Sequence, residues 1–142
     1  YNIRYLLERW QSPDGNYIAY TCKKMTGMDY SISTNSDIYL YHLPSKSTEN
    51  LSAGQMGFDM APVFSPDGTR IAWESMERDG YESDKTRIMV FDVASGTTKN
   101  YSENFDQNAG GFSWKGNEEI FFISLSVWTV FRVNLLSRER KR

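Results

Sequence analysis

The sequence has 142 residues, of which 39% are hydrophobic and 15% aromatic, and a net charge of −2. This composition suffices for one modest folded domain and excludes an intrinsically disordered chain. Four of the last five residues are basic, so the rest of the chain is more acidic than the total, and no nucleic-acid groove is expected. The single cysteine, Cys22, excludes an internal disulfide and a cysteine-based zinc site.

Two further features bear on the membrane and on secretion. No apolar run approaches the roughly 18 residues that a membrane-spanning helix needs. The first ten residues, YNIRYLLERW, lack the apolar centre of a signal peptide. We therefore expect no membrane span, and a mature or truncated chain fits both absences.

One phrase recurs along the chain. SPDGNYIAY begins at Ser12, SPDGTRIAW begins at Ser65, and a degraded third copy, SWKGNEEIFF, begins at Ser113. The steps of 53 and 48 residues are about the length of one four-stranded propeller blade. The repeat therefore indicates a propeller architecture.

Runs rich in aromatic and β-branched residues surround each copy and predict strands in the same order in each repeat. The strand candidates are 4–11, 17–23, 37–43, 60–65, 70–74, 87–93, 110–114, 119–124 and 130–135. Fourth strands are expected after tight turns within LPSKSTENL and VASGTTKNY, which begin at Leu43 and Val93.

The predicted fold is an all-β, partial β-propeller of about three four-stranded antiparallel blades in an open ring, spanning 1–142. The blades are expected at about 4–54, 58–104 and 108–136, followed by a basic tail at 137–142, which is more typical of a solvated end than of a nucleic-acid site. Closed propellers have at least four blades. We therefore expect this chain to be a fragment of a larger protein, and to self-associate in isolation through its open blade edges.

The SPDG turn has a structural explanation. Proline presets φ near −65°, aspartate accepts local backbone N–H groups, and glycine supplies a positive φ before the next strand. The third copy replaces proline and aspartate by Trp114 and Lys115 but keeps Gly116. We therefore assign Asp14 and Asp67 to turn geometry rather than to catalysis.

The phrase SPDG-x-x-IA-[YW], followed by DIYLY or RIMVFD, resembles the repeats of two propeller groups. One is the periplasmic Tol-associated propeller protein. The other is the N-terminal propeller of serine peptidases of the prolyl oligopeptidase and dipeptidyl peptidase family. The long acidic loop within 57–92 is more similar to a bacterial dipeptidyl-peptidase-type propeller, in which such hairpins are long.

The peptidase resemblance implies a propeller that caps an α/β-hydrolase domain and limits the access of peptides to a Ser, Asp and His triad. That domain and the remaining blades would be the partners of this segment, a peptide would be the substrate, and the chain alone would have no activity. A periplasmic or secreted location is also implied. The alternative is a Tol-associated-type propeller that acts as a protein-interaction module, and a propeller-fold glycosidase would need paired carboxylates that we do not find.

No catalytic, cofactor-binding or metal-binding residue is assigned from the sequence, and the substrate-binding residues are unknown. Ser113 lies in the nearest match to G-x-S-x-G, which fails at the last glycine and falls in a strand-to-strand turn. The pair Glu118 and Glu119 would point to opposite faces of a strand, so an ammonium-binding role is not carried over. His42 is expected to be a packed or edge histidine, and Cys22 a small core residue.

The connections 24–36 and 75–86 are long and polar. In a propeller they would project side by side and offer a surface to a partner, although ordinary mobile loops are an equal alternative. The carboxylates at 74, 77, 79, 82 and 84 do not match an EF-hand loop, so a solvated acidic loop is preferred over a calcium site. The larger aromatic residues are expected in the core: Trp10, Trp73, Tyr81, Phe105, Phe112 and Trp114.

Overall fold

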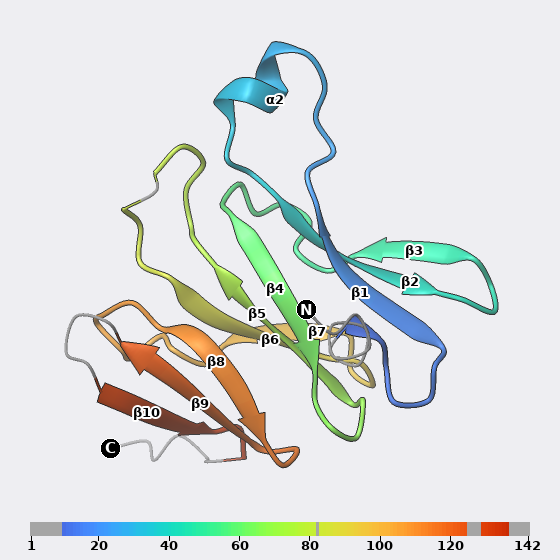
Figure 1. Ribbon diagram of the computed structural model, residues 1–142, viewed down its shortest axis with the longest axis vertical. Helices are drawn as coiled ribbons and strands as arrows, with labels where there is room; N and C mark the ends of the chain where they lie inside the picture. The colour runs from blue at the N-terminus through green and yellow to red at the C-terminus, as the bar shows by residue number, and fades with distance from the viewer. Residues whose placement is uncertain (1–9, 82, 125–128, 137–142) are drawn as a thin grey trace, which may run out of the picture.

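The computed structural model describes residues 10–81, 83–124 and 129–136 (Figure 1). Its strands are β1 (Tyr17–Cys22), β2 (Asp37–His42), β3 (Ser47–Asn50), β4 (Asp59–Phe64), β5 (Arg70–Ser75), β6 (Arg87–Asp92), β7 (Thr97–Asn100), β8 (Gly110–Lys115), β9 (Glu119–Ser124) and β10 (Thr129–Asn134). The helix α2 spans Met28–Ile32. Among the described residues we find no helix with the length and apolar character needed to cross a membrane.

The strands form three antiparallel sheets with the orders β1-β2-β3, β4-β5-β6-β7 and β10-β9-β8. This arrangement confirms the all-β class and the repeated strand order, and Figure 1 shows the sheets side by side without closing into a ring. The middle sheet has the four strands of a blade, but each flanking sheet has three among the described residues. Of the predicted strand 4–11, only Gln11 is seen to pair, with Ile18. Residues 4–9 and the basic tail 137–142 lie outside the described residues.

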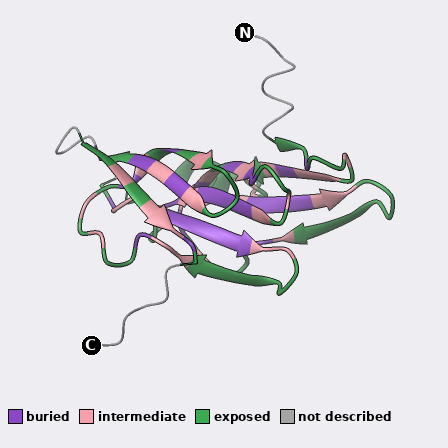
Figure 2. Ribbon diagram, turned by 90° about the horizontal axis from the view of Figure 1, so that it is seen from below, coloured by how far each residue is buried: buried purple, intermediate pink, exposed green. Residues whose placement is uncertain are grey.

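The two central strands of the middle sheet, β5 and β6, are buried on both faces, which explains their nearly continuous apolar runs (Figure 2). Successive side chains of a strand point to opposite faces, so each strand contributes to two interfaces. The side that meets the first sheet carries Ile71, Trp73, Met89 and Phe91. The side that meets the third sheet carries Ala72, Ile88 and Val90.

Trp73 lies in the first interface and is completely buried. Its indole Nε1 donates a 3.0 Å hydrogen bond to Oδ1 of Asp59, which is also completely buried. The second carboxyl oxygen, Oδ2, makes no hydrogen bond of good geometry with the described residues. Burial raises the pKa of Asp59, and the side chains of Ser75, Trp73 and Ser52 only partly oppose this shift.

Neighbouring sheets are joined by the same backbone contact at both interfaces. The N–H of Asp59, at the start of β4, donates to the carbonyl of Ser36 at 3.1 Å. The N–H of Ala109, just before β8, donates to the carbonyl of Thr86 at 2.9 Å. The second sheet is therefore attached to the residue that precedes β2, and the third sheet to the residue that precedes β6.

The structure corrects our alignment of the third repeat. Trp114 pairs with Ile120 between β8 and β9, as Phe64 pairs with Ile71 between β4 and β5. Ser113 therefore lies inside β8 and not in the turn. The error arose because the hairpin between β8 and β9 is shorter than the one between β4 and β5. An alignment of the three copies by their letters therefore placed Ser113 too late in its repeat. Its glycine, Gly116, still has a positive φ of 63°.

Four of the six aromatic residues expected in the core are buried or partly buried there: Trp73, Phe105, Phe112 and Trp114. The prediction is wrong for Trp10 and Tyr81, which are 41% and 54% exposed. Trp10 precedes the first described strand, and Tyr81 lies at the tip of the loop between β5 and β6. Neither position is covered by a neighbouring sheet.

Candidate functional site formed by two joined loops

Two long loops project from the same end of the sheets (Figure 1). Residues 23–36 connect β1 to β2, and residues 76–86 connect β5 to β6. They are hydrogen-bonded to each other, which confirms that they lie side by side. The first loop contains α2, which the sequence did not predict because five residues are too few to show helical periodicity.

Asp79 joins the loops. Its Oδ1 accepts hydrogen bonds from the backbone N–H groups of Thr34 and Asn35, at 2.6 and 3.1 Å, and its Oδ2 accepts one from Ser33 Oγ at 2.7 Å. The N–H of Gly80 donates in return to Thr34 Oγ1 at 2.8 Å. The bond from Ser33 is the main cause of the lowered pKa of Asp79. We call these five residues the loop clamp.

The second loop is also braced internally. The Arg78 guanidinium forms a salt bridge with Asp84, and its backbone N–H donates to Asp84 Oδ2 at 2.9 Å. The side-chain hydrogen bonds from Arg78 lower the pKa of Asp84. Arg78 also lies over the Tyr81 ring, 4.2 Å from its centroid. The loop thus has a defined shape.

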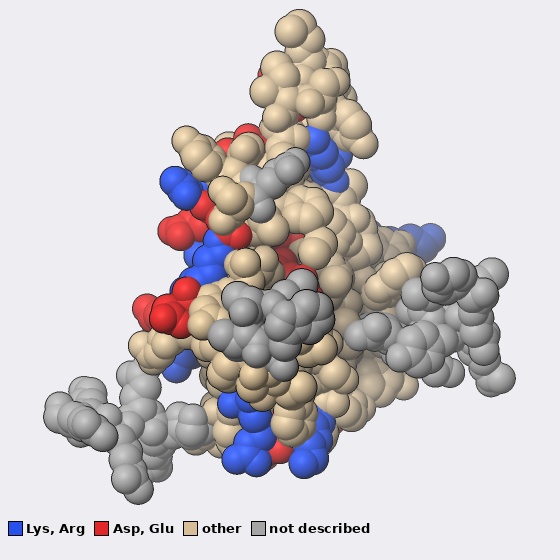
Figure 3. All heavy atoms as spheres, turned by 60° about the vertical axis from the view of Figure 1, so that its left-hand side comes forward, with Lys and Arg blue, Asp and Glu red and all other residues tan. Residues whose placement is uncertain are grey.

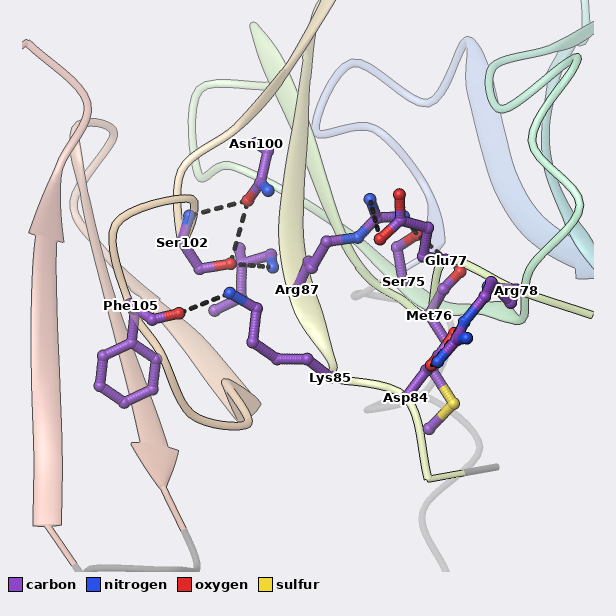
Figure 4. A network of polar contacts seen from close by, with 11 residues as sticks. Ser75, Met76, Glu77, Arg78, Asp84, Lys85, Arg87, Asn100, Ser102 and Phe105 are labelled. Carbon is purple, nitrogen blue, oxygen red and sulfur yellow. Dashed lines mark hydrogen bonds and ion pairs between the residues drawn. The ribbon is translucent and has the colours of Figure 1, made fainter. Parts of the chain in front are cut away.

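The base of the same loop has further contacts (Figure 4). Arg87 donates from Nη2 to Ser75 Oγ at 3.2 Å, and its Nη1 lies 3.9 Å from a Glu77 carboxylate oxygen. Lys85 Nζ donates at 2.6 Å to the backbone carbonyl of Phe105, which lies in the connection between β7 and β8. The base of the loop is therefore attached to the middle sheet and to the segment that leads to the third sheet.

The acidic residues of the loop are solvated only in part. Glu77 is exposed, as we expected from the sequence, and lies 3.9 Å from Arg87. The other described carboxylates have closer partners, which are Gly111 N–H for Glu74, the first loop for Asp79 and Arg78 for Asp84. Glu82 lies outside the described residues. Across the described parts of the chain, no three His, Cys, Asp or Glu side chains form a group that could hold a metal. Figure 3 shows acidic and basic side chains next to one another below a mainly uncharged tip.

The SPDG turns lie at the opposite ends of these strands. Asp67 Oδ1 accepts from Ser65 Oγ at 2.7 Å and from the Thr69 N–H at 3.1 Å, and Asp14 makes the equivalent contacts with Ser12 and Asn16. Hydrogen bonding from Ser12 is the main cause of the lowered pKa of Asp14. For Asp67, partial burial opposes the shift, but the hydrogen bonds prevail and lower the pKa. Both carboxylates are occupied by turn geometry, as predicted.

The nucleophile and base candidates are not brought together. Ser113 pairs with Phe121 within the third sheet. His42 packs on the Tyr17 ring, with centroids 4.6 Å apart, which confirms the packed histidine. Its Nδ1 lies 2.6 Å from Ser45 Oγ in an exposed turn, and no carboxylate of the described residues is bonded to the ring. This pair lacks the third group that orients a catalytic base.

The other two candidates have structural surroundings. Glu119 lies 3.6 Å from Arg132 Nη1 on the neighbouring strand, while Glu118 is exposed in the hairpin turn. Cys22 is half-buried at the end of β1 and is not part of either core cluster. The core assignment of Cys22 was wrong because β1 directs Ala19 and not Cys22 into the first interface.

Comparison with curated proteins relates the chain to one group of peptidases. It is 53% identical over 114 residues to dipeptidyl-peptidase 5 of Porphyromonas gingivalis, which covers 80% of this chain and 17% of that protein. It is 32% identical over 92 residues to dipeptidyl-peptidase 5 of Schizosaccharomyces pombe, covering 63% of this chain and 13% of that protein. The chain is a propeller-like segment of the peptidase family. It spans less than a fifth of the length of these relatives.

Solved structures agree in fold. An acylaminoacyl peptidase from Pyrococcus horikoshii is 20% identical with a TM-score of 0.56, covering 77% of this chain and 16% of that one. TolB from Acinetobacter baumannii is 16% identical with a TM-score of 0.58, covering 93% and 33%. No family model matches the chain. The 53% identity to dipeptidyl-peptidase 5 confirms the resemblance to that peptidase family, whereas the matches to the two solved structures show the fold alone.

Sequence inspection missed a second repeated feature that supports the sheets. Ser52 Oγ accepts the Ile38 N–H at 3.0 Å, while the Ser52 N–H donates to Asn50 Oδ1. Ser102 and Asn100 make the same contacts in the second repeat. The signal was available as Asn-x-Ser, at a step of 50 residues.

Proposed function

We propose that this segment is the non-catalytic propeller part of a dipeptidyl-peptidase-like serine peptidase. It would restrict and guide the access of peptides to a hydrolase domain outside this chain. The observation that carries the proposal is the 53% identity to a dipeptidyl-peptidase 5 of which this chain spans 17%. The absence of an assembled triad among residues 10–81, 83–124 and 129–136 is compatible with this role.

The loop clamp supports the part of the proposal that concerns access. A filter has to hold its shape against an incoming peptide, and Asp79 fixes the first loop to the second through side-chain and backbone hydrogen bonds. Because these bonds join the ends of two different sheets, they also limit how far the sheets can separate at that end. Loosening them should admit larger substrates.

The test compares full-length protein carrying Asp79→Ala with wild type and with Glu49→Ala, a control on exposed β3. We expect kcat/KM for long peptides to rise relative to that for a dipeptidyl chromogenic substrate in Asp79→Ala alone. An unchanged ratio would argue against an access role. Turnover of the chromogenic substrate by the isolated segment would argue against placing the chemistry outside it.

A second candidate is a propeller that serves as a protein-interaction module. The structural match to TolB covers 93% of the chain, and for this reason we retain the interaction module as a second candidate. The full reading frame distinguishes the two: a G-x-S-x-G elbow followed by Asp and His supports the peptidase, and further blades alone support the module.

We further propose that the isolated segment self-associates through its open blade edges. The third sheet exposes apolar side chains at its outer side, with Ile123, Val130 and Leu136 at 42%, 62% and 55%. An unpaired edge next to such side chains is prone to association. Light scattering that shows a stable monomer at high concentration would contradict this.

A further inference from the structure

The backbone of Asp59 is part of the junction between the first two sheets. Its N–H donates to the Ser36 carbonyl at 3.1 Å, and its own carbonyl accepts the Ser36 hydroxyl at 2.8 Å. The Ser36 N–H in turn donates to the carbonyl of Gly57 at 3.3 Å. Ser36 is the last residue of the first long loop, so this junction fixes the base of that loop.

The junction between the second and third sheets has the same backbone contact without a carboxyl group. The N–H of Ala109 donates to the Thr86 carbonyl at 2.9 Å, and Thr86, like Ser36, is the last residue of a long loop. Ala109 and Asp59 are both completely buried. An alanine is therefore sufficient at this position, whereas the burial of a carboxyl group costs free energy. The Asp59 side chain needs an explanation other than the packing of the sheets.

The neighbours of the Asp59 carboxyl group offer it few hydrogen-bond donors. Trp73 Nε1 donates to Oδ1 at 3.0 Å, while Oδ2 makes no hydrogen bond of good geometry with the described residues. The Ser52 hydroxyl has one proton, which it donates to Asp37 Oδ1 at 3.2 Å. Ser75 pairs with Asp59 between β4 and β5 and is the other hydroxyl beside the group. An ionised carboxylate, with about four acceptor positions, would thus be short of donors, whereas a protonated carboxyl group can itself donate to Ser75 Oγ.

Two charged groups act on Asp59 from neighbouring strands. Asp37 of β2 is acidic, and its negative charge adds to burial in raising the pKa of Asp59. Arg87 of β6 lies beyond Ser75 in the same row of paired residues, and its Nη2 donates to Ser75 Oγ at 3.2 Å (Figure 4). Its Nη1 lies 3.9 Å from Glu77, on the side away from Asp59. On this face of the middle sheet, β5 adds only uncharged side chains.

We propose that Asp59 is a pH-sensitive switch at the junction of the first two sheets. Protonated Asp59 donates from Oδ2 to Ser75 Oγ, and the junction stays closed. When Asp59 loses this proton, a buried carboxylate remains that lacks donors, so the state in which the junction opens and water reaches the carboxylate becomes more populated. The second junction, closed by Ala109, has no such response.

The switch acts on the candidate site because the junction adjoins the loop clamp. The N–H of Asn35, next to Ser36, donates to Asp79 Oδ1 at 3.1 Å. The pKa of Asp79 is lowered, so the clamp is lost as pH falls through it, whereas the junction is lost as pH rises through the raised pKa of Asp59. The two loops are therefore held most firmly between these two pKa values. This inference does not depend on peptidase activity.

The test is amide hydrogen exchange of the full-length protein over a pH series, corrected for the pH dependence of the intrinsic exchange rate. The Asp59 N–H reports on the first junction, and the Ala109 N–H is the matched internal control. We expect protection of the Asp59 N–H to fall about tenfold per pH unit between the unfolded pKa of about 3.9 and the folded pKa, and then to level off. Protection of the Ala109 N–H should not change.

Three variants sharpen the test. Asp59→Asn should make protection at the first junction independent of pH. Asp37→Asn removes a like charge, so protection should level off at a lower pH. Glu49→Gln on exposed β3 should behave as wild type. A wild-type slope that is absent, equal at Ala109 or retained in Asp59→Asn would overturn the inference.

Infrared spectroscopy of the wild type tests the protonated form without any substitution. The C=O stretching band of a protonated carboxyl group should persist at about pH 6, where exposed carboxyl groups are ionised. Loss of this band in parallel with the fall in Asp59 protection would support the switch. Absence of the band, or a band that disappears with no change in protection, would overturn it.

Discussion

The two ends of the strands are stabilised by contacts of different range. At the turn end, Asp14 and Asp67 bond to groups two residues away. At the loop end, Asp79 bonds to residues 44 to 46 positions away. The turn end can therefore form within one repeat, whereas the loop end requires two sheets to be assembled. Substitutions at the two ends should differ accordingly.

The largest effect is expected at the loop end, for Gly57→Ala. The added Cβ would lie 1.7 Å from the Met76 carbonyl oxygen, so the backbone of one segment has to move, at a cost of about 3 kcal/mol. The control is Gly54→Ala, where φ is 84° but nothing lies within 4 Å, and about 1–2 kcal/mol is expected. Denaturant unfolding of the full-length variants measures both. Equal losses would show that the close approach is relieved by small shifts.

The second comparison is made within the turn end. Gly15 and Gly68 have φ values of 76° and 74°, so alanine should strain both turns similarly. At Gly68, however, the Cβ would also lie 2.8 Å from the Pro13 Cδ of the neighbouring turn, against 3.5 Å from a flexible Gln11 side chain at Gly15. We expect Gly68→Ala to cost about 1 kcal/mol more than Gly15→Ala. Indistinguishable unfolding midpoints would refute direct packing between the two turns.

The third prediction contrasts two carboxylates by pH. The pKa of buried Asp59 is raised, so the protonated form favours the folded state. The contribution of Asp59 to the free energy of unfolding should then be fully present below the unfolded pKa of about 3.9 and be lost as pH rises through its raised folded pKa. Asp59→Asn should remove that decline. A pH series of unfolding midpoints tests this, and parallel curves for variant and wild type would contradict it.

Asp79 should behave in the opposite way. Its pKa is lowered, so its contribution is present above the unfolded pKa and is lost as pH falls through the folded pKa. Protonation of Asp79 is expected to loosen the two loops rather than unfold the sheets, because the loop clamp lies outside the core clusters.

The smallest effect on global stability is therefore predicted for Asp79→Ala. Amide hydrogen exchange at Thr34 and Asn35 should accelerate, since their N–H groups lose their acceptor. Exchange at Thr69, whose N–H bonds to Asp67 at the turn end, should not change. Glu49→Ala is the control variant. Acceleration at both ends would show that the loop clamp supports the whole sheet pair.

Much of the fold could be predicted because its determinants are local. The φ values near 75° at Gly15 and Gly68 and the strands around them follow from short stretches of sequence. The nearly continuous apolar run of β5 likewise indicates burial on both faces, since successive side chains face different sheets. The prediction for Ser113 was wrong because it relied on neighbouring residues that resemble a turn. The position of Ser113 is set instead by strand pairing with Phe121.

The candidate site could be predicted only in outline. That the two loops would meet follows from the repeat, but that Asp79 would connect them does not. Any of the loop carboxylates was equally eligible as a calcium ligand or a solvated group.

By itself, the sequence determined the class of fold, the order of the strands and the structural role of the SPDG aspartates, because each depends on the backbone preferences of a few adjacent residues. Only the tertiary structure decided the register of the third repeat and the loop clamp, because these depend on which distant groups meet once the sheets have packed.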